Sequence, residues 1–247
     1  MTTKVVPGQL VATFDVEHVA TEAAARIARA LREAIAQRGA AAIALSGGNT
    51  PRGAYARLAK LAGIDWSRVS VFWVDERAVP PTDDRSNYRW AKAELLDQAA
   101  IPKEQVYRMP AYAKDLAAAA REYDALVRAK VKAEGDMPAF DVLVLGIGDD
   151  GHTASMFPGE RTVDIVDRVC VDVPAKAPAR EARLTLTAPV LENARAAFVL
   201  AVGREKCPAL EDVWAASGDI HKTPARVVRG IRGSLTWIID KAAGGMG

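Results

Sequence analysis

Short apolar runs of strand length alternate along this chain with longer segments of helical periodicity. Strand-like runs cover residues 10–14, 41–45, 69–74, 142–145, 169–173, 183–186, 196–202 and 235–239. Helical segments are predicted at 16–37, 51–61, 87–98, 113–133 and 204–216, and Asp15 can cap the first of them. Strands that alternate with helices predict an α/β fold, a mostly parallel open sheet with helices on both faces. No repeat, linker or composition break interrupts residues 1–247, so one domain is expected.

The charge balance argues against several classes of partner. The chain has 33 Lys and Arg against 31 Asp and Glu, and its basic residues are scattered, so we expect no nucleic-acid or membrane partner. The N-terminus lacks an apolar leader and no apolar run approaches about 18 residues, which predicts a cytoplasmic protein. Cys170 and Cys207 stand far apart in apolar surroundings, so two reduced thiols are favoured over a disulfide or a metal site.

The apolar run at 142–145 ends in a glycine-rich segment that carries polar chemistry. Gly146, Gly148 and Gly151 allow tight turns, and the segment presents two carboxylates and His152. Such polar groups at strand ends lie where open α/β sheets bind ligands. The spacing also matches the dinucleotide fingerprint G-x-G-x-x-G, but Pro158 interrupts any following helix and the carboxylates would repel phosphates. A nicotinamide or flavin site is therefore not expected.

A second loop follows the run at 41–45. It contains Ser46, Gly47, Gly48, Asn49 and Thr50, and it leads into a helix for which Thr50 suits the N-cap and the next residue, a proline, the first helical position. Its free N–H groups and its hydroxyls can surround a phosphate. The alternative is an ordinary strand-to-helix turn with a good cap.

The run at 69–74 leads into a third polar cluster. Asp75, Glu76 and Arg77 follow it directly, and the loop through residue 86 is polar and Pro-rich. The alternative here is a solvated loop with surface ion pairs, which are individually weak. Because three strand ends each carry polar side chains, we expect one shared site.

These motifs together resemble the 6-phosphogluconolactonase family, which is related to the glucosamine-6-phosphate isomerases and deaminases. The matching stretches are 46–51, 73–77 with 86–87, and 146–158, with weaker matches at 182–187 and 203–206. Asn49 stands where a serine is usual, and Met156 where leucine is common. The resemblance implies a Rossmann-like fold of the isomerase/lactonase type. It also implies a small-molecule phosphosugar lactone as substrate, 6-phospho-D-glucono-1,5-lactone, hydrolysed in the pentose phosphate or Entner–Doudoroff pathway.

The resemblance also suggests roles for residues of this chain. His152 is the expected general base for an attacking water, because neutral imidazole is available near neutral pH. Asp150 either orients the imidazole or accepts hydrogen bonds from the turn. Arg77 either stabilises the oxyanion or holds the phosphate, and Asp75 either positions Arg77 or contacts a sugar hydroxyl.

The loop 46–50 is expected to bind the phosphate with help from Arg183 and Lys206, although each of these two could equally be an exposed surface cation. No cofactor or metal is expected, since a zinc site needs more nitrogen or sulfur ligands than this segment supplies.

Two other functions remain open. A deaminase of the related type needs a glutamate five residues past the motif histidine, and Phe157 stands there instead. A non-catalytic sugar-phosphate sensor is the other alternative, and the intact His152, Arg77 and Asp75 argue against it. A monomer or a small homo-oligomer is expected.

Overall fold

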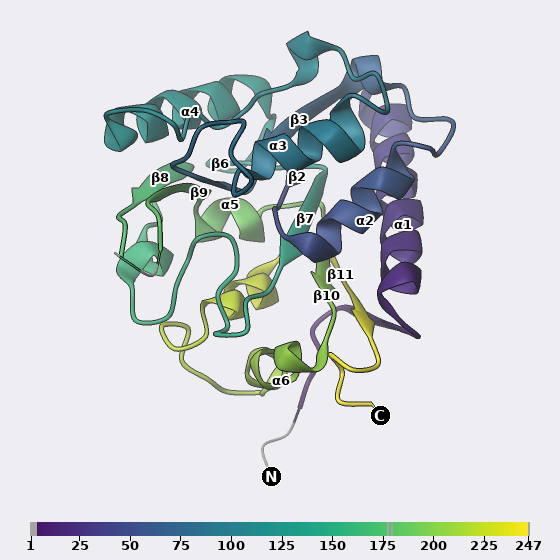
Figure 1. Cartoon of the computed structure of the whole chain (residues 1–247), viewed down its shortest axis with the longest axis vertical. Helices are drawn as coiled ribbons and strands as arrows, with labels where there is room; N and C mark the ends of the chain where they lie inside the picture. Colours follow the sequence, from purple (N-terminus) through teal and green to yellow (C-terminus); the bar gives the residue numbers. More distant parts are fainter. Residues whose placement is uncertain (1–3, 177, 179, 247) are drawn as a thin grey trace.

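The centre of the molecule is a parallel sheet of six strands. A computed structural model describes residues 4–176, 178 and 180–246, so the first three residues of the N-terminal segment considered above lie outside the description. The strands are β1 (Gln9–Thr13), β2 (Ala41–Leu45), β3 (Val69–Trp73), β7 (Val142–Gly146), β10 (Ala196–Ala201) and β11 (Ser234–Asp240). Their order is β1-β11-β10-β7-β2-β3, with every neighbouring pair parallel (Figure 1). The predicted α/β class with a mostly parallel sheet is confirmed.

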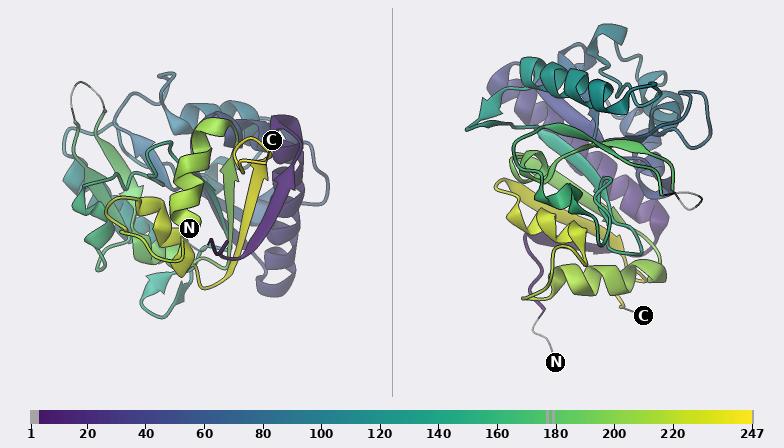
Figure 2. Two further views of the ribbon diagram at one scale, coloured as in Figure 1. Left: turned by 90° about the horizontal axis from the view of Figure 1, so that it is seen from below. Right: turned by 90° about the vertical axis from the view of Figure 1, so that its left-hand side faces the viewer.

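Helices pack on both sides of this sheet. Its helices are α1 (Val16–Arg38), α2 (Asn49–Leu58), α3 (Asn87–Ala91), α4 (Leu116–Lys130), α5 (Ala188–Glu192) and α6 (Cys207–Trp214). In the left view of Figure 2, α1 lies on one side of β10 and β11 and α6 on the other. As predicted, Asp15 caps α1 by accepting a hydrogen bond from the His18 N–H. Each large apolar side chain that α1 buries fully, such as Ile27 or Leu31, contributes about 1.5–3 kcal/mol.

A second, antiparallel sheet was not predicted from the sequence. Its strands are β4 (Asp75–Arg77), β9 (Arg183–Leu186) and β8 (Cys170–Val173), in that order. The segment of β4 was predicted as irregular because nothing local favours a strand there; its partner β9 lies far along the chain. A short hairpin of β5 (Ala133–Glu134) and β6 (Met137–Pro138) completes the strands of the described residues. Cys170 is buried and Cys207 is half-buried, and the structure joins neither of them in a disulfide.

Several predicted helix boundaries were wrong. Thr50 is not the N-cap of α2: the helix begins at Asn49, and Gly48 is the cap, with a φ of 100° that favours glycine. The helix predicted over 87–98 is α3 followed by a π-helical turn over Lys92–Leu96. The one predicted over 113–133 is shorter, because Asp115 caps α4 and Ala133 pairs in the hairpin. The one predicted over 204–216 begins as a 3-10 turn before α6.

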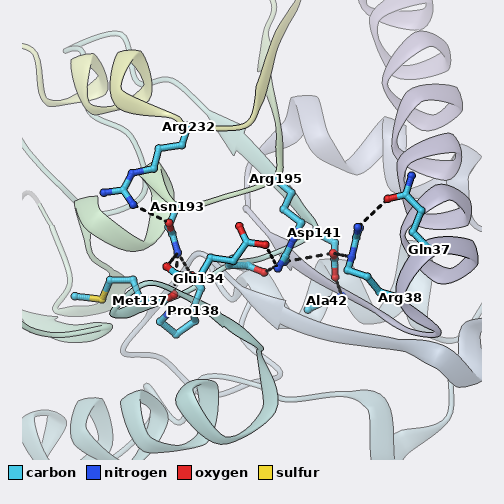
Figure 3. Close-up of polar contacts among 11 residues, drawn as sticks. Gln37, Arg38, Ala42, Glu134, Met137, Pro138, Asp141, Asn193, Arg195 and Arg232 are labelled. Atoms are coloured by element: carbon cyan, nitrogen blue, oxygen red, sulfur yellow. Dashed lines mark hydrogen bonds and ion pairs between the residues drawn. The ribbon is translucent and has the colours of Figure 1, made fainter.

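A buried carboxylate joins the elements at the amino edge of the sheet (Figure 3). Asp141, just before β7, accepts hydrogen bonds from Arg38 Nε of α1 at 2.8 Å and from the Ala42 N–H of β2 at 2.8 Å. Arg195, just before β10, approaches the same carboxylate at 3.4 Å. Beside it, Asn193 donates to the carbonyls of Glu134 and Met137 in the hairpin. This edge lies opposite the loops that carry the predicted site. We therefore expect the contacts of Asp141 to stabilise the fold and not to take part in ligand binding.

We predict that Asp141→Ala lowers the free energy of unfolding by about 3 kcal/mol, because it leaves the buried Ala42 N–H without its acceptor and removes one acceptor from each of two guanidinium groups. Urea denaturation measures this value. The exposed pair Arg29–Glu33 provides the control, since Glu33→Ala should hardly change the free energy of unfolding. Equal losses for the two variants would contradict the role of Asp141.

A histidine joins two loops that flank the segment 146–158. His221 Nε2 lies 2.8 Å from Asp164, and its Nδ1 lies 3.3 Å from Asp219. The hydrogen bond and charge of Asp164 raise the pKa of His221 above its ordinary value of 6.5, and Asp219 adds to the effect. The His221 carbonyl also accepts the Gly159 N–H at 2.7 Å, which ties the two loops together.

Because its folded-state pKa is raised, His221 stabilises the fold fully below the unfolded-state pKa and loses this effect as pH rises through the folded-state value. We therefore predict that His221→Gln destabilises the protein at about pH 5.5 and hardly at all at about pH 8.5. Urea denaturation of both proteins across this range is the measurement. A difference that does not change with pH would rule out the ionic contribution.

Candidate active site

One cavity of about 190 Å³ collects most of the predicted site residues. It lies at the carboxyl edge of the parallel sheet, where the loops after β2, β3, β7 and β10 meet β4 and β9. Its lining consists of Ser46, Gly47, Gly48, Asp75, Arg77, Asn87, Gly146, Ile147, Gly148, His152, Ala154, Arg183 and Lys206. The strand that follows β2 in the chain, β3, lies on one side of it, and the next strand of the sheet, β7, lies on the other side. Open α/β sheets commonly bind ligands at such a reversal of the strand order.

The loop after β7 holds His152 against a carboxylate. Asp150 accepts hydrogen bonds from His152 Nδ1 at 2.6 Å and from the His152 N–H at 3.0 Å, so it both orients the ring and closes the turn. Partial burial raises the pKa of the Asp150 carboxyl, but the hydrogen bonds and charge of His152 outweigh it and the net pKa is lowered. An ionised Asp150 that accepts the Nδ1 proton leaves Nε2 with its lone pair.

Glycine is required beside this histidine. A Cβ at Gly148 would lie 2.0 Å from His152 Nδ1 and 2.5 Å from the Asp150 carboxylate. Gly151 has a φ of 83°, and a Cβ there would also contact Thr223. The glycines of the motif therefore make room for the imidazole and its partner, and no dinucleotide is needed to explain them.

Asp75 is a buried acceptor shared by three segments. Its carboxylate accepts hydrogen bonds from Ser155 Oγ at 2.6 Å, from Asn87 Nδ2 at 3.2 Å and from an Arg183 NH group at 3.3 Å. Of the two roles suggested for Asp75, an ion pair with Arg77 is not what the structure shows, because the antiparallel pairing of β4 with β9 brings Arg183 to Asp75 instead. Contact of Asp75 with a sugar hydroxyl stays a prediction. Asp75 therefore fixes Arg183 and the loop that carries His152.

Three cations line the cavity. Arg77 and Arg183 are paired residues of β4 and β9, and the Nε of each is buried without an acceptor among the described residues. Burial lowers the pKa of Arg183, and the charge of Arg77 acts in the same direction, while Asp75 opposes them. Lys206 forms an ion pair with Asp149, and Arg77 makes no ion pair within the described chain. Partly buried cations, two of which have a buried Nε without an acceptor, indicate a site for an anion.

The loop after β2 contributes through its backbone. A Cβ at Gly47 would lie 1.7 Å from Asn87 Oδ1, so only glycine fits there. Gly47 and Gly48 line the cavity at the N-terminus of α2, where N–H groups and the helix dipole favour an anion. The Ser46 hydroxyl donates to the Val144 carbonyl.

Three predicted residues lie outside the lining. Asn49 is exposed on the first turn of α2, and Thr50 follows it there rather than capping the helix. Asp150 also does not line the cavity, because it stands behind His152.

Two residues of the site were not predicted from the sequence. Asn87 lines the cavity, and its Oδ1 is buried without a donor among the described residues. Ser155 is fully buried against Asp75. Both lie within stretches that match the family, yet neither shows a local pattern that would identify its partner. Glu76 supports Asn87 by accepting the N–H groups of Asn87 and Tyr88 at 2.8 and 2.7 Å; burial raises the pKa of this carboxyl despite these hydrogen bonds.

Among the described residues, no three His, Cys, Asp or Glu side chains are grouped as metal ligands would be. None of the helices in the described part of the chain has the length and apolar character needed to cross a membrane.

Comparisons with known proteins agree with the geometry. A 6-phosphogluconolactonase from Synechocystis is 40% identical over 215 residues, which cover 87% of this chain and 88% of the relative. One from Streptomyces coelicolor is 36% identical over 244 residues, with 95% and 93% covered. The solved structure of 6-phosphogluconolactonase from Trypanosoma brucei superposes with a TM-score of 0.85 at 28% identity and covers 96% of this chain and 98% of its own. The family model described as glucosamine-6-phosphate isomerases/6-phosphogluconolactonase matches residues 15–237. With its fold, its cavity and these relatives in agreement, the chain belongs to the glucosamine-6-phosphate isomerase/6-phosphogluconolactonase family.

Proposed function

We infer that this chain hydrolyses 6-phospho-D-glucono-1,5-lactone to 6-phosphogluconate, the lactonase step of the pentose phosphate pathway. The relatives from Synechocystis, Streptomyces coelicolor and Trypanosoma brucei all bear the name 6-phosphogluconolactonase. The observation that carries the inference is one cavity in which a carboxylate-held imidazole accompanies three cationic side chains. A general base beside an anion site suits the attack of water on a phosphorylated lactone.

His152 is proposed as the general base. Its Nε2 takes a proton from a water molecule while the water oxygen attacks the lactone carbonyl carbon, and a tetrahedral oxyanion forms. The bond between that carbon and the ring oxygen then breaks, and the imidazolium returns the proton to the ring oxygen. Asp150 accepts the Nδ1–H throughout and stabilises the imidazolium between the two steps, as its hydrogen bond of 2.6 Å permits.

The three cations are proposed to balance the negative charges of the reaction. The substrate phosphate is close to dianionic at neutral pH, and the attack adds charge on the carbonyl oxygen. Arg77 has no ion-pair partner among the described residues, so its charge is available to the substrate, and Asp75 orients Arg183. The N–H groups of Gly47 and Gly48 complete the anion site. Ser46, Asn49 and Thr50 are proposed to support this loop, because the Ser46 hydroxyl already donates to Val144 and the other two do not line the cavity.

The deaminase alternative is disfavoured by the residue that packs against His152. The ring of Phe157 lies 4.7 Å from the imidazole, centroid to centroid. A phenyl group cannot move protons, whereas isomerisation with loss of an amine needs proton transfer at more than one atom. Hydrolysis of a lactone needs one base and stabilisation of an oxyanion, which the cavity residues can supply.

A cytoplasmic location and a monomer or small homo-oligomer, as one domain, are proposed with this activity. The two free cysteines suit a reducing compartment. The small formal charge of +2 gives no reason to expect a nucleic-acid partner.

We predict that the wild type accelerates the opening of freshly prepared 6-phosphogluconolactone well above a buffer blank, and that His152→Ala lowers kcat by about 10²-fold or more because the base is lost. Acid release at constant pH is the measurement, and the blank is essential because the lactone also opens unaided. A wild type no faster than the blank would reject the function. Ammonia release from glucosamine 6-phosphate would then support the deaminase, and binding of phosphosugars without turnover would support the sensor.

Asp150→Asn tests the partner of the base. The substitution keeps the shape of the side chain but removes the charge that favours the productive tautomer and the imidazolium, so kcat should fall by roughly 10- to 100-fold with little change in KM. Circular dichroism and urea denaturation check that the variant remains folded. A folded variant with wild-type kcat would show that Asp150 serves only the turn.

A further inference from the structure

Behind the cavity, the largely buried side chain of an arginine, a phenylalanine and the histidine form a stack. The ring of Phe157 is 8% exposed and lies against His152 at 4.7 Å, with an angle of 38° between the two rings. The guanidinium of Arg180, which comes from the segment between β8 and β9, lies 3.9 Å from the centre of the same phenyl ring. Neither Phe157 nor Arg180 lines the cavity, so neither is placed to touch the substrate.

Two further contacts hold Arg180 in place. One NH group forms an ion pair with Glu160 at 2.8 Å, and the other donates to the Pro174 carbonyl at 3.0 Å. The Arg180 side chain is only 11% exposed, and its Nε is buried without an acceptor among the described residues. Burying a cation and leaving a donor unpaired costs free energy that an aliphatic side chain in the same place would avoid. The flat guanidinium over the phenyl face offsets part of this cost through a cation–π contact.

Asp150 and Phe157 contact different parts of the imidazole. The Asp150 hydrogen bond holds the Nδ1 edge of His152, and Phe157 packs against one face of the ring. Together, an edge contact and a face contact can define the direction of a planar ring. Arg183 also lies over Phe157, at 5.4 Å, so the same ring contacts a cation that lines the cavity.

We propose that Arg180 is a positioning residue for the catalytic base: held by Glu160, it clamps Phe157 against His152 and so sets the direction of the imidazole Nε2. The proposal rests on the proposed function, in which His152 activates water. Small misplacements of a reacting group can reduce rates by up to about 10²-fold, so the expected effect is on kcat and not on substrate affinity.

The test compares Arg180→Met, Arg180→Lys and Phe157→Leu with a matched control, Arg161→Met. Arg161 lies next to Glu160, but its side chain is 90% exposed and pairs with Asp164 at the surface. Arg180→Met and Phe157→Leu should each lower kcat for lactone hydrolysis roughly 10-fold with KM nearly unchanged. Arg180→Lys, which keeps a cation that can pair with Glu160 and sit over the ring, should recover most of the loss. Arg161→Met should behave as wild type.

A second readout does not depend on turnover. Nitrogen NMR of histidine-labelled protein without substrate reports the tautomer and environment of His152, and Arg180→Met should shift these signals while Arg161→Met should not. A folded Arg180→Met with wild-type kcat and unshifted His152 signals would overturn the proposal, as would an equal loss in Arg161→Met. If Arg180→Met does not fold, Phe157→Leu takes its place: a folded Phe157→Leu with wild-type kcat and unshifted His152 signals would overturn the proposal, and Arg180→Lys should still keep most of the wild-type kcat. If the wild type shows no lactonase activity, the proposed function fails, and the NMR comparison still tests whether Arg180 positions His152.

Discussion

The cavity depends on one buried carboxylate. Asp75 stands where β3 gives way to β4, and it is only 5% exposed. Through Ser155, Asn87 and Arg183 it binds the loop after β7, the start of α3 and strand β9, which are otherwise separate parts of the chain. A buried carboxylate without these donors would be costly, so the three segments and Asp75 stabilise one another.

Around Asp75, some of the cations that line the cavity form ion pairs with carboxylates, and one does not. Arg183 and Lys206 each face a carboxylate, whereas Arg77 donates to the Arg85 carbonyl and has no ion pair among the described residues. The result is a cavity with more positive than negative charge, as an anionic substrate requires. The imidazole sits at the same cavity but takes its partner, Asp150, from outside it. The proposed base is therefore adjacent to the anion site, and its partner Asp150 does not neutralise the cations that line the cavity.

Close approach of the backbone explains the glycines that the sequence presents so clearly. Gly47 leaves room for the Asn87 amide, and Gly148 leaves room for the imidazole of His152. The sequence showed that these glycines follow buried strands, and from this a ligand site at the sheet edge could be predicted. The side chain that fills the space beside Gly47 could not be predicted, because Asn87 belongs to a different element, α3. The same limit applies to Asp75: the resemblance suggested Arg77 or a sugar hydroxyl as its partner, whereas the pairing of β4 with β9 brings Arg183 to it.

By itself the sequence determined the alternation of strands and helices, the parallel sheet and the three polar loops at its edge, while the two possible roles of Asp150 beside His152 stayed open until the structure showed both contacts. These features depend on local spacing, burial periodicity and turn chemistry, all of which act over a few residues. Only the tertiary structure decided the small antiparallel sheet, the contacts of Asp75, and the stack of Arg180, Phe157 and His152. These depend on contacts between segments distant in the chain, and such contacts form where packing and strand register bring the segments together.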